Sequence, residues 1–327
     1  MSSDSKRVLV TGAAGFVGSH LAERLARTGY RVRCFFRYTS TDQRGYLSEL
    51  SATGKVEIIA GDLRDLEAVR QAAQGMDAIF HLGALVGIPY SYVHPLEVVD
   101  TNVMGTVNVL LAARDSSVRQ VIFASTSEVY GTARYVPIDE NHPLHGQSPY
   151  SASKIGAEKI VESFAVTYGL PTTVIRPFNI YGPRQSARAV VPTIITQALA
   201  ADEIRLGNLD ATRDFTYVED TVAAFILAAE SKDAVGKTFN VGSNFEISIR
   251  DLAETVMRLA GRKVPLVEDA ARVRPEKSEV ERLWADSGLI RQTIGWEPAV
   301  SLEEGLGKTI RWISQNLDRY RVGEYAV

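Results

Sequence analysis

A glycine-rich turn near the start constrains the fold of this 327-residue chain more than any other feature. Gly12, Gly15 and Gly18 follow the apolar run 7–11 with the spacing G-x-x-G-x-x-G. Glycines let the backbone turn tightly and approach a pyrophosphate, and the N–H groups at the start of the next helix attract its negative charge. The sequence therefore predicts a strand–turn–helix unit that binds a dinucleotide, with Phe16 and Val17 opening the helix.

Short apolar runs alternate with helical patterns along the first two-thirds of the chain. The runs are rich in Val, Ile and Phe, and most are apolar on both faces, as buried parallel strands are; they span 7–11, 31–36, 56–60, 78–82, 121–125, 172–176 and 238–241. Helical patterns lie between them, at 18–27, 65–74, 102–114 and 151–168. This alternation predicts the α/β class, a doubly wound parallel sheet of the Rossmann type with helices on both faces.

The pattern changes after Pro177, which indicates a smaller C-terminal lobe. Helices are expected from Pro192 to about residue 200, from 249 to about 260 behind a Ser248 cap, and from about Ser301. We expect residues 1–180 to form the dinucleotide-binding domain, to which a segment near 215–243 returns. Residues 181–214 and 244–327 are then the substrate-binding lobe.

Composition excludes several classes of protein. The chain has 36 Lys and Arg against 39 Asp and Glu, and the formal charge of −3 argues against a nucleic-acid partner. Cys34 is the single cysteine, so an internal disulfide cannot form, and the histidines are not spaced as metal ligands, so we predict no metal. The sequence lacks a run of about 18 apolar residues and a signal-peptide core, which predicts no membrane span and a cytoplasmic location.

The ends of the second and third strands bear on the kind of dinucleotide. An acidic residue after the second strand would bind a free ribose 2′-hydroxyl, but this strand ends in Arg37. Arg37 can pair with a 2′-phosphate, which slightly favours NADP over NAD; a plain surface arginine is the other interpretation. Asp62, followed by Leu63, fits either an adenine contact or the N-cap of the next helix.

A tyrosine and a lysine four residues apart form the candidate catalytic pair. Tyr150 and Lys154 lie at a helix start, and this spacing puts both side chains on one face. A nearby ammonium favours the phenolate, so we expect Lys154 to lower the pKa of Tyr150 and allow it to accept a proton. A surface pair is the alternative interpretation. The catalytic interpretation is favoured by Thr126, Ser127 and Glu128, which follow the fifth strand at the edge where such sheets bind ligands.

At this point the chain resembles an extended short-chain dehydrogenase/reductase of the nucleotide-sugar epimerase/dehydratase group. The matching pieces are the glycine loop, 81–84 (HLGA), Asn102, 125–131 (STSEVYG), Tyr150 with Lys154, 176–183 (RPFNIYGP), 213–215 (RDF) and 274–275 (RP). The resemblance implies a tightly bound NAD(P) and an NDP-sugar substrate. It implies cofactor contacts at Leu63, Leu82, Ala84 and Asn102, and substrate contacts at Asn179, Val191, Arg213 and Arg274, with Arg188 and Lys277 as weaker candidates.

The resemblance also indicates a subgroup. Thr126-Ser127-Glu128 is similar to the motif of GDP-mannose 4,6-dehydratases, and 87–92, 185–189 and 274–280 are similar to N-acetylhexosamine nucleotide 4,6-dehydratases of the legionaminic-acid pathway type. Typical 4-epimerases usually lack the glutamate at this place. The alternatives are an NDP-sugar 4-epimerase, a related decarboxylase or 5,6-dehydratase, and a non-catalytic NADP-binding sensor.

Roles for single residues follow from this resemblance. Tyr150, helped by Thr126 and Lys154, would oxidise the sugar at C4, and Glu128 would remove the C5 proton. Ser127 stands where many dehydratases have an aspartic acid for the departing hydroxyl, so either Glu128 does both tasks or a water helps. Helices 102–114 and 151–168 resemble those that form the family's dimeric four-helix bundle, which implies a homodimer.

Overall fold

The computed structural model describes residues 6–38, 46–47, 54–273, 275 and 278–323. Its centre is a seven-stranded sheet with the order β11-β6-β5-β4-β1-β2-β3, in which every pair of neighbours is parallel. The strands are β1 (Arg7–Thr11), β2 (Arg31–Arg37), β3 (Val56–Gly61), β4 (Ala78–His81), β5 (Gln120–Ala124), β6 (Thr172–Pro177) and β11 (Thr238–Val241). The predicted doubly wound parallel sheet is confirmed.

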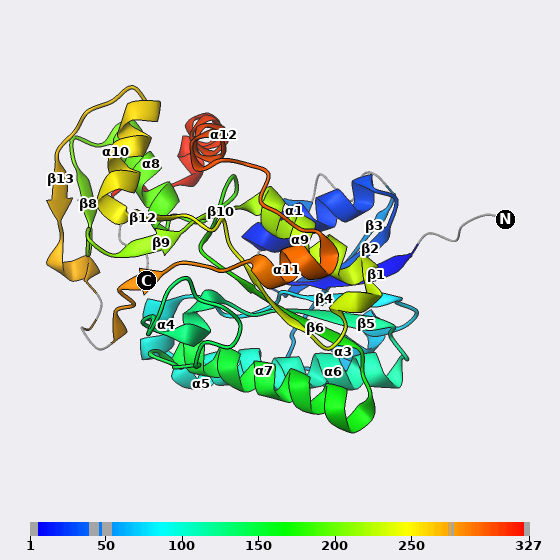
Figure 1. Ribbon diagram of the computed structural model, residues 1–327. Coiled ribbons are helices and arrows are strands. Elements are labelled where there is room, and N and C mark those ends of the chain that lie inside the picture. Colours follow the sequence, from blue (N-terminus) through cyan, green and yellow to red (C-terminus); the bar gives the residue numbers. More distant parts are fainter. Residues whose placement is uncertain (1–5, 39–45, 48–53, 274, 276–277, 324–327) are drawn as a thin grey trace.

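Helices cover both faces of this sheet (Figure 1). One face carries α3 (Leu66–Ala73), α6 (Gly105–Asp115) and α7 (Pro149–Tyr168), and the other carries α1 (Phe16–Arg27) and α9 (Val218–Glu230). The side chains of β1 alternate between the two layers: Val8 and Val10 pack with α1 and α9, whereas Leu9 packs with α3 and α6. Strands that are buried on both faces explain the nearly continuous apolar runs in the sequence.

Most of the remaining elements lie beside the carboxyl ends of the strands, whereas α11 (Gly288–Ile294) lies against the edge of the sheet near α9 (Figure 1). Helices α8 (Val190–Ala200), α10 (Ile249–Leu259) and α12 (Leu302–Gln315) pack on one another, and α11 contacts β11. Small sheets pair β8 (Ile204–Leu206) with β13 (Leu266–Glu268), β7 (Ile180–Tyr181) with β10 (Thr216–Tyr217), and β9 (Thr212–Asp214) with β12 (Glu246–Ser248) and β14 (Arg282–Leu283). One hydrophobic cluster runs from β1 into α8 and α12, and the domain boundaries drawn from the sequence stay a prediction.

The sequence located the regular elements well, with one notable difference. Ser248 and Ser301 cap α10 and α12 as expected, and β11 returns to the edge of the sheet. The helix expected from residue 102, however, begins earlier. Its first part is α5 (Pro95–Val99), and a π-helical turn, Asp100–Met104, joins α5 to α6. Pro95 can open this helix because the first helical position needs no N–H donor.

The sequence predicted no membrane span, and one helical stretch of the structure can be compared with this prediction. Among the described residues, Pro95–Asp115 is long and apolar enough to cross a membrane by length and composition alone, a test that core helices also pass. Of its most apolar window, 44% is buried, and its parts pack against α3 and α7. The cytoplasmic location stays a prediction.

A buried histidine joins the first strands of the fold to a helix. His81 at the end of β4 is 1% exposed; its Nδ1 lies 2.8 Å from Thr11 Oγ1 on β1, and its Nε2 lies 3.0 Å from Thr106 Oγ1 on α6. Burial, and to a lesser extent the charge of Lys154, lowers the pKa of His81 to about 3. The ring is therefore neutral in the folded protein at any ordinary pH.

We expect this histidine to make the protein sensitive to acid. Below its ordinary pKa of 6.5, His81 binds a proton in the unfolded chain but not in the folded one, so stability is lost as the pH falls toward about 3. Its contribution to the free energy of unfolding should fall by about 2 kcal/mol between about pH 7 and about pH 5. Denaturant titrations of the wild type and of His81→Gln at both pH values measure this. Equal losses in the two proteins would show that His81 does not cause the acid sensitivity.

Candidate active site

A cavity of about 490 Å³ opens at the carboxyl ends of β1, β4, β5 and β6. Doubly wound sheets bind ligands at this edge, next to the point where the strand order reverses. Here that point lies between β1 and β4. The lining comes from both parts of the chain and includes Phe16, Val17, Leu82, Ala84, Ser125, Thr126, Ser127, Glu128, Tyr150, Lys154, Asn179, Gln185, Arg188, Val191, Asn208, Arg213, Phe215 and Glu279.

The glycine turn forms a cradle in which side chains have no room. Gly12 has φ +70°, and a Cβ added there would lie 2.8 Å from the backbone of Gly83. A Cβ on Gly18 would lie 2.3 Å from the carbonyl oxygen of Gly12. The N-cap of α1 is Gly15, which gives no side-chain hydrogen bond, so the N–H groups of the first turn remain available for an anion. The predicted cradle for a pyrophosphate is therefore present, and these residues fit a dinucleotide.

A second hollow of about 120 Å³ lies at the ends of β2 and β3 and contains the residues predicted to bind adenosine. Gly12, Arg37, Asp62 and Leu63 all line it. Asp62 is not an N-cap, because Asp65 caps α3. The Asp62 carboxylate instead accepts hydrogen bonds from Arg64, and these bonds lower its pKa.

Arg37 has a partner that the sequence did not reveal. Its guanidinium lies 3.2 Å from the carboxylate of Glu97 in α5, and its side chain is 57% exposed. Glu97 also accepts a hydrogen bond from Tyr90. The two residues of the ion pair are 60 positions apart, so no local pattern could have linked them. The Arg37 side chain is thus exposed to solvent, and the carboxylate of Glu97 offsets part of its charge.

Asn102, predicted to contact the cofactor, binds the protein backbone, and its contact with the cofactor stays a prediction. Its side chain accepts a hydrogen bond from Leu85 N (2.8 Å) and donates to Leu85 O (3.0 Å) and Ser153 Oγ (2.9 Å). These bonds occupy both ends of the amide, and Asn102 is 1% exposed. Asn102 therefore positions the loop after β4, in which Ala84 lines the cavity, and ties it to α7.

Tyr150 and Lys154 reach the cavity from the first turns of α7. Ser148 caps this helix in a reciprocal pair of hydrogen bonds with Ser151, and Pro149 occupies its first position. Tyr150 is 6% exposed and Lys154 is 4% exposed, although both line the cavity. The predicted common face of the helix is confirmed, because both side chains reach the same hollow.

The electrostatics of the pair differ from the prediction. Burial raises the pKa of Tyr150, a hydrogen bond with Thr126 lowers it, and the charge of Glu128 raises it further. Lys154 is not the group that lowers the pKa of Tyr150, because its Nζ donates to the carbonyl oxygen of Ala124 at 2.6 Å and lies over the ring of Phe123. Burial lowers the pKa of Lys154 itself to about 8, while Glu158 opposes this shift.

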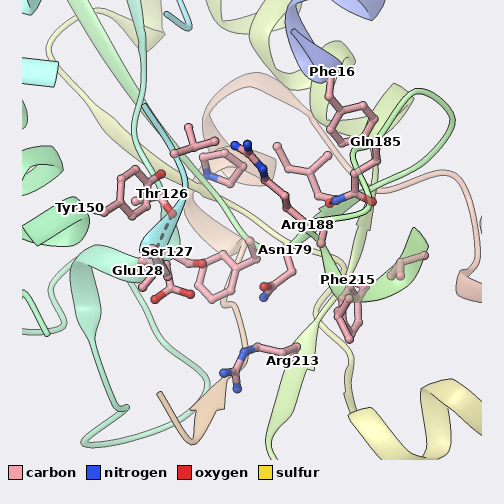
Figure 2. A pocket seen from close by; sticks show the side chains of 18 of the residues that line it. Phe16, Thr126, Ser127, Glu128, Tyr150, Asn179, Gln185, Arg188, Arg213 and Phe215 are labelled. Atoms are coloured by element: carbon pink, nitrogen blue, oxygen red, sulfur yellow. Dashed lines mark hydrogen bonds between the residues drawn. The ribbon is translucent and has the colours of Figure 1, made fainter. Parts of the chain in front are cut away.

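Glu128 enters the cavity on a 3-10 turn, Ser127–Tyr130, directly after β5. Thr126 caps this turn by accepting a hydrogen bond from Glu128 N at 3.2 Å. Figure 2 shows Thr126, Ser127, Glu128 and Tyr150 grouped on one side of the cavity. The structure therefore brings together a phenol, an ammonium, a hydroxyl and a carboxylate that the sequence places on separate elements.

The residues predicted to bind substrate have different surroundings. Asn179 and Val191 line the cavity. Arg213 does so as well, but its guanidinium pairs with Glu279 at 3.2 Å and donates to two carbonyl groups. Arg188 is exposed and lines the cavity wall, and Figure 2 shows its side chain in the same part of the pocket as Thr126 and Asn179.

Some site residues lie beyond the described structure or were missed. Arg274 and Lys277 lie outside the described residues. Glu279, Gln185 and Phe215 line the cavity, although no role was predicted for them. Glu279 is placed in the site by its ion pair with Arg213, which lies far away in the chain. A single sequence gives no sign of such a long-range pair. Among the described residues, no group of three or more His, Cys, Asp or Glu side chains is placed to hold a metal ion.

Comparisons with known proteins show the family to which the chain belongs. The family model described as GDP-mannose 4,6 dehydratase matches residues 9–309. A UDP-N-acetyl-alpha-D-glucosaminuronate decarboxylase of Bacillus cytotoxicus is 35% identical, with 95% of this chain and 98% of that protein covered. A UDP-glucose 4-epimerase of Mycolicibacterium smegmatis is 34% identical, with 94% and 98% covered.

Solved structures of the same group are also similar. The dTDP-glucose 4,6-dehydratase DesIV of Streptomyces venezuelae, solved with NAD bound, superposes with a TM-score of 0.87 at 30% identity, over 96% of this chain and 98% of that one. The chain therefore belongs to the GDP-mannose 4,6-dehydratase-like family of nucleotide-sugar epimerases and dehydratases, within the extended short-chain dehydrogenases/reductases. The family resemblance seen in the sequence is confirmed.

Proposed function

We propose that this protein is an NAD(P)-dependent NDP-sugar 4,6-dehydratase, acting on an NDP-hexose and specifically on an NDP-N-acetylhexosamine. The observation that carries the proposal is Glu128, which lines the same cavity as Tyr150 and Thr126 and whose charge acts on Tyr150. A carboxylate beside the C4-oxidising pair supplies the base that water elimination needs and that a 4-epimerase does not use. The choice of N-acetylhexosamine rests on the sequence resemblance alone.

The residues that would hold the cofactor run along the edge of the sheet. The first turn of α1, opened by Phe16 and Val17, would receive the pyrophosphate. Arg37, Asp62 and Leu63 would surround the adenosine, whereas Leu82, Ala84 and Lys154 lie toward the reactive end of the cavity. A nicotinamide held there would supply reversible hydride transfer with the sugar, so the net reaction would need no external oxidant.

The first half of the reaction belongs to α7 and Thr126. Tyr150, as phenolate, takes the proton of the sugar 4-hydroxyl while the C4–H bond breaks and C4 becomes a ketone. Thr126 hydrogen-bonds the same oxygen, and the Lys154 ammonium supplies positive charge one helical turn away. Because burial raises the pKa of Tyr150, the enzyme depends on the Thr126 hydrogen bond, which lowers this pKa, to make the phenolate accessible near neutral pH.

The second half belongs to Glu128. The C4 ketone acidifies the proton on C5, because the negative charge that forms spreads onto oxygen. Glu128 takes this proton and returns it to the departing C6 hydroxyl, which leaves as water, so one carboxyl group balances both transfers. Ser127 is buried beside it and too weak an acid to replace it. Hydride returned to C6 together with a proton added at C5 would give the 4-keto-6-deoxy sugar. The proton that Tyr150 took from the 4-hydroxyl balances the one added at C5, by exchange through solvent.

Cations along the cavity would bind the diphosphate of the substrate. Arg188 is the most exposed of them, and Arg213 is partly offset by Glu279. We propose that Asn179 and both arginines contact the NDP group and that Val191 packs on the nucleotide base. The predicted role of Arg274 in this contact stays a prediction.

The relatives include dehydratases, epimerases and a decarboxylase at similar identity, so the product decides between them. Incubation with a panel of UDP-, GDP- and dTDP-hexoses, read by mass spectrometry, separates the outcomes. Loss of one water supports the dehydratase, an isomer of unchanged mass supports an epimerase, and loss of carbon dioxide from a uronic acid supports a decarboxylase. Binding without turnover supports the non-catalytic sensor.

Glu128→Gln tests the mechanism directly. The variant keeps the side-chain shape but cannot take the C5 proton, so water loss should slow by at least about 100-fold while C4 oxidation remains. Mass spectrometry of the product and the nicotinamide absorbance in a single turnover measure the two steps. Glu162→Gln, an exposed carboxylate on α7, is the matched control and should behave as wild type. Full turnover by Glu128→Gln would refute the assignment.

Cofactor preference is the second test. We propose that Arg37 binds a 2′-phosphate and thereby makes NADP the preferred form. Glu97 competes with this phosphate for the Arg37 guanidinium. Arg37→Gln should weaken NADP binding about tenfold, and Glu97→Gln should strengthen it, with little change for NAD in either variant. Calorimetric titration measures both ligands. A wild type that binds NAD more tightly, or variants that do not change the ratio, would contradict the proposal.

We also propose a homodimer in which α5, α6 and α7 pack against the same helices of a second copy. Leu96 is 79% exposed, Met104 51% and Val99 42%, and all three lie on the helical stretch Pro95–Asp115. Light scattering at micromolar protein should give the mass of a dimer, and Leu96→Asp should shift it toward the monomer. Val235→Asp, at an exposed valine elsewhere, is the control. A monomeric wild type would contradict the dimer.

A further inference from the structure

Behind the turn that carries Glu128, four buried polar side chains and one half-buried carboxylate, Glu140, form a network that does not line the cavity. It contains Tyr130, Glu140, Glu158, Arg176 and Asn240. Tyr130 and Asn240 have no exposed surface, Glu158 is 5% exposed and Arg176 is 6% exposed. The proposed chemistry uses none of these groups.

The network is a continuous chain of hydrogen bonds. Arg176 on β6 holds Glu158 with two parallel bonds, from Nε at 2.9 Å and from Nη2 at 2.6 Å. Its third nitrogen, Nη1, donates to the Tyr130 hydroxyl at 2.8 Å. That hydroxyl in turn donates to Asn240 Oδ1 on β11 at 2.6 Å. Tyr130 is thus fixed from two neighbouring strands by its one oxygen atom.

The two ends of this chain lie on the two elements that carry the proposed reaction. Tyr130 ends the 3-10 turn in which Glu128 is the second residue. Glu158 is on α7, one turn beyond Lys154 and two turns beyond Tyr150. The backbone of Asn240 also donates to the Glu140 carboxylate at 2.7 Å, and Asn240 Nδ2 donates to Ile138 O at 2.9 Å. The network therefore joins the turn to the helix through the sheet.

Stability alone gives little reason for such a network. Removing an arginine and a glutamate from water carries a desolvation penalty that can exceed their mutual attraction, and well-packed apolar residues are often as stable in such places. A bidentate ion pair whose nitrogens each donate to a defined acceptor does, however, fix the distance and angle between its two elements more narrowly than apolar packing does. A network of this kind suits a task in which two separate elements must keep one spacing.

We propose that Tyr130, Arg176 and Glu158 are positioning residues that set Glu128 at the distance from Tyr150 at which it reaches the C5 proton. This proposal rests on the proposed function. Tyr150 and Lys154 keep their own anchors in the helix cap and in Ala124 O, whereas the turn of Glu128 is held by the Thr126 cap at its start and by the Tyr130 hydroxyl at its end. Loss of that hydroxyl should therefore impair the step that Glu128 performs and spare C4 oxidation.

Tyr130→Phe tests this, because it removes one oxygen atom and keeps the ring that packs on Phe178 and His142. In single turnovers with the NDP-hexose that the wild type dehydrates, water loss should slow by about tenfold or more while C4 oxidation stays within about twofold and KM is unchanged. Tyr135→Phe is the matched control: its hydroxyl donates to Asp139 on the same loop but lies outside the network. It should leave both steps unchanged.

A second variant keeps the test decisive if Tyr130→Phe does not fold. Arg176→Lys retains a cation beside Glu158 but gives up the bond to Tyr130, so the same selective loss is expected. Equal slowing of both steps, or none, would overturn the positioning role while the dehydratase stands. A different outcome would overturn the proposed function and this inference with it. In that outcome the wild type releases no water from an NDP-hexose, and Glu128→Gln keeps whatever activity the wild type has.

Discussion

All seven strands of the main sheet run parallel, and this constraint decides where chemistry can occur. Parallel strands place all of their carboxyl ends at one edge, so the glycine turn, the Thr126 turn and the segment after Pro177 meet there although the chain separates them widely. The register of β1 with β4, in which Thr11 faces His81, also brings the backbone of Gly12 against that of Gly83. The cradle for the cofactor is therefore a product of strand pairing.

Burial creates the second constraint. Tyr150 and Lys154 are both nearly inaccessible, and burial favours their neutral forms, since it raises one pKa and lowers the other. The site opposes this with fixed dipoles, namely the Thr126 hydroxyl and the carbonyl group of Ala124. Such preorganised groups cost no reorganisation during a reaction, which is how buried sites stabilise charge. Placement of these donors matters as much as the identity of the titrating residues.

Short-range signals in the sequence predicted much of the fold and part of the site. The apolar runs located every strand of the main sheet, and the glycine spacing located the cradle. The four-residue spacing of Tyr150 and Lys154 gave their common face. Where the prediction for the pKa of Tyr150 failed, a distant partner intervened, because Lys154 donates to Ala124 O. The partners of Asn102, Leu85 and Ser153, are likewise distant in the chain.

The sequence by itself determined the α/β class, the family and the set of residues able to carry the chemistry, because periodicity and short motifs are local properties of the chain. Only the tertiary structure decided how charges are paired, as in Arg37 with Glu97, Arg213 with Glu279, and Arg176 with Glu158 and Tyr130. The reason is physical. A charge takes the partner that burial and strand register bring within hydrogen-bonding distance, and separation along the chain has no influence on that choice.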